Sequence, residues 1–201
     1  MNPAGQEREL EIHPLTMDRW SDLETLFGPH GADGGCWCMY WRLARKQFLA
    51  GSGDPNRQMF KKIVETGKPV GLLAYSEGKP VGWMAVAPRE EYPTMDRSRV
   101  VKRVDKKKVW SISCFYIASG YRHSGVTLAL IEASKGFVRQ QHGTIIEGYP
   151  IVPKVDKVSP GSAYTGVFST FLKAGFKEVA RYSATRPIMR FELSQPGVKD
   201  E

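Results

Sequence analysis

A turn between a hydrophobic run and a helical segment lies in the middle of the chain. Residues 109–117 are mostly β-branched or aromatic and predict a β-strand. From residue 126 to residue 137 apolar side chains recur at helical spacing and predict an amphipathic helix. A turn that enters a helix N-terminus presents unpaired N–H groups, which attract anions. Residues 119–127 therefore predict a phosphate-binding turn, and Gly125 lets a phosphate approach the backbone closely.

The segment 115–127 resembles the acetyl-CoA motif of the GNAT superfamily of N-acetyltransferases. In that motif a strand is followed by Arg or Gln, two residues, Gly, one residue, and Gly or Ala. Arg122, Gly125 and Thr127 stand at these positions, although Thr127 is larger than the usual residue. A second match is Gly175-Phe176, which resembles the late helix-to-strand junction of the superfamily. The resemblance implies acetyl-CoA as co-substrate, bound by Phe115, Tyr116, Ile117, Arg122, His123, Ser124, Gly125, Val126 and Thr127.

The predicted order of elements also fits the superfamily. A chain of 201 residues with 41% hydrophobic content is long enough to bury one substantial core. The resemblance implies an α/β fold in one domain, with a central mixed and twisted sheet of six or seven strands flanked by about four helices. We expect this acetyltransferase domain at residues 9–193, with polar tails at 1–8 and 194–201. Within it, residues 163–174 predict a helix and residues 144–152 a strand that Pro150 bends or ends.

An aromatic segment follows a glycine-rich loop near the N-terminus. Trp37, Tyr40 and Trp41 lie within seven residues, after the loop 31–35. Such a segment suits either dense packing or the wall of a binding pocket. In the GNAT fold the region between the first two helices borders the acceptor site, so the resemblance favours a substrate-binding wall. Aromatic faces also attract ammonium groups.

Acetyl transfer to an amine needs a proton acceptor for the amine. Many GNAT relatives carry a glutamate early in the strand before the turn, but residues 109–114 contain no carboxylate. We expect Glu147, on the next strand, to act as the general base. The alternatives are that Glu147 is an ordinary surface glutamate and that the amine is deprotonated through a water chain.

The reaction also needs a donor that stabilises the oxyanion and an acid that protonates the leaving thiolate. The resemblance assigns the oxyanion to a backbone N–H near residues 115–117. The tyrosine that often protonates the thiolate in relatives is replaced here by Phe171. We therefore predict Tyr164 as the acid, with a structural tyrosine as the alternative.

Cysteine content bears on metals and on the cellular setting. Three cysteines and no signal peptide predict a reducing, cytoplasmic setting, and no apolar run is long enough to span a membrane. Cys36-x-Cys38 lacks the paired clusters of a zinc site, so we expect no metal. A thiol in a strand, such as Cys114, usually serves as a small apolar filler. A homodimer is one assembly that the sequence allows.

A basic run precedes the central strand. The chain carries a net charge of +8, and residues 97–108 concentrate Lys and Arg. This run fits a solvated loop, contact with CoA phosphates or an anionic acceptor, or a nucleic-acid surface. We predict an acetyl-CoA-dependent N-acetyltransferase for a small-molecule or peptide amine. A basic nucleic-acid-binding module and a catalytically degenerate CoA-binding GNAT fold are the alternatives.

Overall fold

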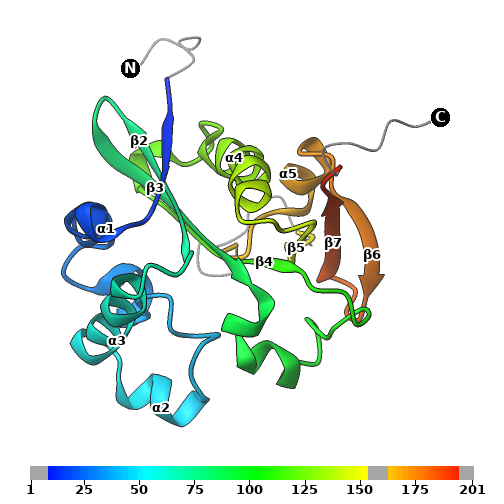
Figure 1. The fold of residues 1–201 in the computed structure, drawn as a ribbon, viewed down its shortest axis with the longest axis horizontal. Coiled ribbons are helices and arrows are strands. Elements are labelled where there is room, and N and C mark those ends of the chain that lie inside the picture. Colours follow the sequence, from blue (N-terminus) through cyan, green and yellow to red (C-terminus); the bar gives the residue numbers. More distant parts are fainter. Residues whose placement is uncertain (1–8, 154–162, 195–201) are drawn as a thin grey trace.

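A seven-stranded mixed sheet forms the centre of the protein (Figure 1). The structure, a computed structural model, describes residues 9–153 and 163–194. The strand order is β1-β2-β3-β4-β5-β7-β6; β4 and β5 pair in parallel, and the other neighbours pair antiparallel. The strands are β1 (Glu11–Pro14), β2 (Gly71–Ser76), β3 (Lys79–Pro88), β4 (Trp110–Ile117), β5 (Ile145–Gly148), β6 (Lys177–Arg181) and β7 (Pro187–Glu192).

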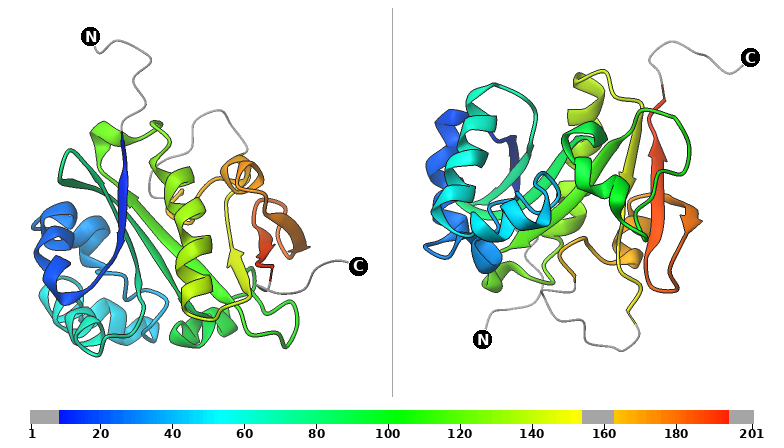
Figure 2. Two further views of the ribbon diagram at one scale, coloured as in Figure 1. Left: turned by 45° about the horizontal axis from the view of Figure 1, so that its top comes forward. Right: turned by 90° about the horizontal axis from the view of Figure 1, so that it is seen from below.

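Helices cover both faces of the sheet (Figure 2). The α-helices are α1 (Trp20–Phe27), α2 (Arg45–Ala50), α3 (Asp54–Glu65), α4 (Val126–Gln140) and α5 (Phe168–Lys173). Side chains of β3 alternate between two hydrophobic clusters, as the pleat of a strand requires. Met84 and Val86 belong to the cluster with α4 and α5, whereas Trp83 and Ala85 belong to the cluster with α1 and α3.

The connection between β3 and β4 covers a further part of the sheet. It contains two 3₁₀ turns, Arg89–Glu91 and Pro93–Arg97. Tyr92, Met95 and Val101 are buried there against Tyr149 and Ile188, in a third hydrophobic cluster. The connection that contains the basic run 97–108 is therefore a folded element with its own apolar contacts.

The structure confirms the α/β fold with seven strands and corrects several elements. The described residues contain five α-helices where the resemblance implied about four, because α2 follows the aromatic segment. The helix expected at 163–174 begins only at Phe168, since Gly166 has φ of 86° and breaks the helical path before it. β5 ends at Gly148, before Pro150. The expected tails lie outside the described residues except for Ser194.

Two adjacent strands separate at the middle of the sheet. β4 pairs with β5 only from Trp110 to Ile112. Beyond this point β4 continues to Ile117, whereas β5 has ended. Phe171 of α5 is fully buried at the end of β5, and a Cβ atom on Gly148 would overlap its ring. Within the described residues, the second half of β4 is thereby left without a neighbouring strand on this side.

Candidate active site

A cavity of about 930 Å³ lies beside the unpaired half of β4. It is bordered by four parts of the chain: the end of β4, the turn into α4, the loop before α2, and the segment before α5. Of the predicted cofactor-binding residues, those that line it are Phe115, Tyr116, Ile117, Arg122, His123, Gly125, Val126 and Thr127. Ser124 does not line it; its hydroxyl donates to the carbonyl of Tyr121 at 2.6 Å.

The turn into α4 places a helix N-terminus at the cavity. Gly125 adopts φ of 86°, and a Cβ atom there would meet nothing within 4 Å. The Arg122 side chain folds back, and its Nε donates to the carbonyl of Ile117 at 3.2 Å. The first N–H groups of the 15-residue helix α4 are not used within the helix. The predicted anion-binding turn is therefore formed with space in front of it.

Backbone N–H groups of β4 alternate between β3 and the cavity side. Ala118 N–H, just after β4, donates to the carbonyl of Val81 in β3. Because the direction alternates along a strand, the N–H groups of Phe115 and Ile117 point away from β3. Phe115 N–H donates to the carbonyl of Tyr164 at 2.6 Å. Phe115 N–H is therefore already used in a hydrogen bond. Ile117 N–H faces the side on which the cavity lies and is the better candidate to stabilise an oxyanion.

Tyr164 lies in the segment before α5 and lines the cavity. Its backbone is held against β4 by the bond from Phe115, and its ring packs edge-on against Tyr40 with centroids 6.4 Å apart. Burial, with a smaller effect of Tyr40, raises the pKa of Tyr164 to about 12. The hydroxyl therefore stays protonated near neutral pH, as an acid for a leaving thiolate must.

The aromatic segment divides between the cavity and the core. Tyr40 and Trp41 line the cavity with Phe48, and the Tyr40 ring lies edge-on to both neighbours, at 4.9 and 5.4 Å. Trp37 does not line it. Its backbone has φ of 40°, and its ring is buried against α1, stacked on Trp20 at 6.1 Å. Trp37, which we expected in the acceptor wall, is therefore part of the core beside α1 and does not border this cavity.

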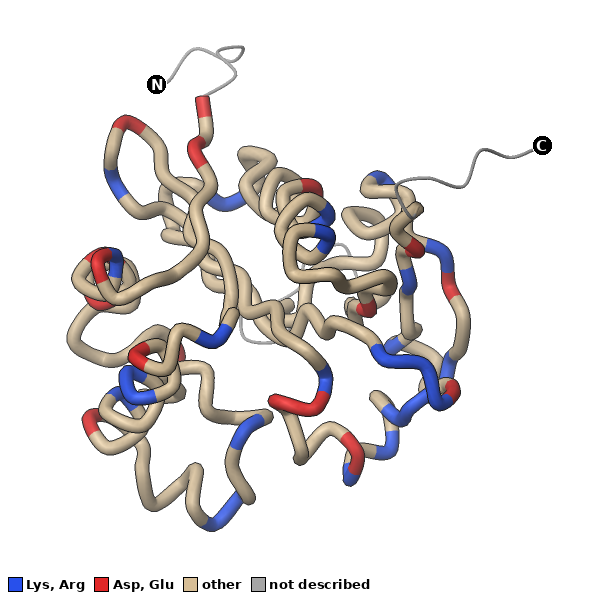
Figure 3. Tube along the Cα trace, viewed as in Figure 1, with Lys and Arg blue, Asp and Glu red and all other residues tan. Residues whose placement is uncertain are grey.

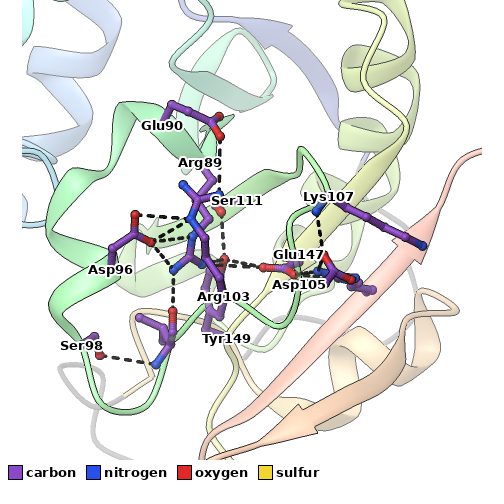
Figure 4. Close-up of polar contacts among 12 residues, drawn as sticks. Arg89, Glu90, Asp96, Ser98, Arg103, Asp105, Lys107, Ser111, Glu147 and Tyr149 are labelled. Atoms are coloured by element: carbon purple, nitrogen blue, oxygen red, sulfur yellow. Dashed lines mark hydrogen bonds and ion pairs between the residues drawn. The ribbon is translucent and has the colours of Figure 1, made fainter.

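Glu147 lies away from the cavity, which argues against the predicted general base. Its side chain is 1% exposed and accepts a hydrogen bond from Arg190 at 2.6 Å. It accepts a second one from the hydroxyl of Tyr149 at 2.9 Å (Figure 4). Arg89 lies 3.7 Å away and donates to the Tyr149 hydroxyl. A carboxylate held in this way has no access to an amine in the cavity, and both of its oxygens already accept hydrogen bonds. Asp33, at an exposed position, is the acidic residue among those that line the cavity.

The buried charges continue into the basic connection before β4. Arg190 also pairs with Asp105 at 2.6 Å, and Arg89 pairs with Asp96 at 3.0 Å. Figure 3 shows Lys and Arg following one another along this connection. Arg103 contacts Asp96 at 3.2 Å, and Lys107 contacts Glu192 of β7 at 3.4 Å. These contacts anchor the run to the sheet and support its interpretation as a structural, solvated element.

Residues 9–153 and 163–194 contain neither a cluster of metal-ligating side chains nor a helix suited to span a membrane. No group of three His, Cys, Asp or Glu side chains in this part of the chain is arranged to hold a metal ion. None of its helices has the length and apolar character that crossing a membrane demands.

The family model described as the acetyltransferase (GNAT) family matches residues 37–148. The chain therefore belongs to the GNAT family of acetyltransferases.

Solved structures share the fold at low sequence identity. PaiA N-acetyltransferase from Thermoplasma acidophilum, in complex with coenzyme A, is 13% identical with a TM-score of 0.52, over 92% of this chain and 99% of that one. A GNAT acetyltransferase from Listeria monocytogenes is 11% identical with a TM-score of 0.55, over 92% and 95%. No curated protein matches the sequence.

Proposed function

We propose that the protein transfers an acetyl group from acetyl-CoA to an amine of a small molecule or peptide. The observation that carries this proposal is the continuity of the site. One cavity joins the anion-binding turn at α4, the unpaired half of β4 and an aromatic wall. The turn suits the phosphates of acetyl-CoA, and the unpaired half of β4 suits its amide-containing arm. The aromatic wall suits the acceptor amine.

Bound acetyl-CoA would supply the activated thioester. The N–H groups at the start of α4 hold the pyrophosphate, and Ile117 N–H is the candidate donor to the developing oxyanion. Tyr164 donates its proton to the leaving sulfur, because its hydroxyl is protonated and the residue lines the cavity. With Glu147 outside the cavity, water in the cleft takes the proton of the amine.

Gly125→Asp tests the anion-binding turn. The new carboxylate would stand where the phosphates bind and repel them. We expect acetyl-CoA binding, measured by calorimetry, to weaken at least about tenfold, or 1.4 kcal/mol.

Gly67→Asp is the matched control. Gly67 has φ of 73°, a Cβ atom placed on it would likewise meet nothing within 4 Å, and it does not line the cavity. The substitution therefore adds the same strain and charge elsewhere and should leave affinity unchanged. Equal affinities in the two folded variants would refute the turn as the phosphate site. Acetyl-CoA binding without turnover on a panel of amines would instead support the catalytically degenerate alternative.

Tyr40→Ala tests the acceptor wall. Tyr40 is 43% exposed, and its ring packs against Trp41, Phe48 and Tyr164 around the cavity. If the wall binds a cationic amine, removing one aromatic face should raise the KM for the amine by roughly 2- to 30-fold, with acetyl-CoA affinity preserved. Leu49→Ala is the control, because Leu49 is exposed outside the cavity. An unchanged KM for Tyr40→Ala would remove this residue from the acceptor site.

A further inference from the structure

The three cysteines, far apart in the sequence, border the same cavity. Cys36 and Cys38 lie in the loop before α2, and Cys114 lies on β4. Cross-strand partners share a face of a sheet. Cys114 is opposite Ala85 and Tyr116 is opposite Trp83, so these four side chains face α1 and α3. Cys38 is buried in the same cluster.

Cys38 is surrounded by groups that stabilise a thiolate. The indole Nε1 of Trp83 donates to its Sγ at 3.0 Å, and Trp83 is fully buried. The thiol of Cys114 interacts directly with the same sulfur, and the guanidinium of Arg42 adds positive charge nearby. Hydrogen bonding from Cys114, together with Trp83 and Arg42, lowers the pKa of Cys38 despite its burial. Interaction with Cys38 and burial raise the pKa of Cys114 well above its usual range, and its thiol also lies 3.7 Å from the carbonyl of Phe115.

Cys36 has a different environment. Its thiol faces the carbonyl of Gly31 at 3.8 Å, and burial raises its pKa to about 11. Since the thiolate is the reactive form, the structure separates one activated thiol from one inert thiol two residues away.

We propose that Cys38 and Cys114 form a peroxide-reactive dithiol site, in which a hydroperoxide entering the cavity converts the pair to an intramolecular disulfide. The Trp83 N–H on Cys38, the β3–β4 register that puts Cys114 on the same face as Trp83, and the position of both cysteines in one cluster at the cavity carry the proposal. It does not depend on acetyl transfer.

The reaction balances with hydrogen peroxide as the oxidant. The Cys38 sulfur attacks one peroxide oxygen, the O–O bond breaks, and water leaves, giving a sulfenic acid. The Cys114 sulfur then attacks Cys38, the S–S bond forms, the S–O bond breaks, and the second water leaves with the remaining proton. Two thiols are oxidised and one peroxide is reduced to two waters. The product would tie the loop before α2 to β4 across one wall of the cavity.

The test treats the reduced chain of 201 residues with hydrogen peroxide near neutral pH. Of the three thiols, we expect two to be lost, with a decrease in intact mass of about 2 Da and one crosslinked peptide pair containing Cys38 and Cys114. Dithiothreitol should restore all three thiols.

Cys36→Ser is the matched control and should still form the crosslink, whereas Cys38→Ser and Cys114→Ser should not. Circular dichroism shows whether each variant is folded, and the result on the unmodified protein stands without them. Three free thiols after treatment, a disulfide that includes Cys36, or oxidation of Cys38 beyond sulfenic acid without a crosslink would overturn the proposal.

Discussion

Glu147→Gln is expected to lower the free energy of unfolding by about 3 kcal/mol without abolishing turnover. The carboxylate is 1% exposed and joins Arg190, at 2.6 Å, to the Tyr149 hydroxyl, at 2.9 Å. A neutral amide leaves two buried arginines with less negative charge, although Arg190 keeps Asp105 and Arg89 keeps Asp96. Because these partners remain, we expect the loss of unfolding free energy to lie at the lower end of the range for a broken buried ion pair. Thermal denaturation should show a midpoint lower by roughly 10 °C.

Glu132→Gln supplies the same chemical change on the surface. Glu132 pairs with Lys135 at 2.6 Å on α4, with its side chain 47% exposed, so its removal should cost less than about 0.5 kcal/mol. Similar midpoints for the two variants would contradict a structural role for Glu147. A turnover loss of a hundredfold in folded Glu147→Gln would return this residue to the mechanism.

The sequence predicted those parts of the site that depend on local pattern. Residues 115–127 combine a strand, a turn and a helix start that are adjacent in the chain, so their geometry follows from short-range preferences. The structure places the turn, and eight of the nine predicted cofactor-binding residues line the cavity. The family resemblance singled out these residues because the turn that we propose as the anion site is made by consecutive residues.

The parts that depend on contacts between distant segments were predicted less well. Glu147 was expected at the cavity because it lies on the strand beside β4, but its face of β5 is covered by the connection before β4. That connection places Arg89 and Asp105 beside β5 and β7, which no local pattern in residues 144–152 reveals. The burial of Trp37 was likewise not predicted, because its left-handed backbone interrupts the spacing from which its direction would be inferred.

The thiol pair shows the same limit. Cys38 and Cys114 are 76 positions apart, and each alone indicates a small apolar filler. Their relation depends on the register of β3 with β4, which puts Trp83 and Cys114 on one face, and on the loop that brings Cys38 to the Trp83 indole. Only the folded chain supplies that proximity.

Tyr164→Phe is expected to lower turnover about a hundredfold while preserving acetyl-CoA affinity. The ring and the bond from Phe115 N–H to the Tyr164 carbonyl remain, so only the proton donor is removed. Burial raises the Tyr164 pKa to about 12, which keeps the hydroxyl protonated over the working range. The loss should therefore be similar from about pH 7 to about pH 10, since the acid does not titrate within that interval.

Tyr40→Phe is the control that separates acid catalysis from wall packing. Tyr40 borders the same cavity and contacts the Tyr164 ring edge-on at 6.4 Å, and its substitution likewise removes one hydroxyl. Because no proton transfer is assigned to Tyr40, turnover should change by less than about threefold. Equal losses in both variants would indicate that the hydroxyls only shape the wall. Unchanged turnover in Tyr164→Phe would mean that water protonates the leaving thiolate, just as water accepts the proton of the amine. The protein would then contribute only positioning and oxyanion stabilisation.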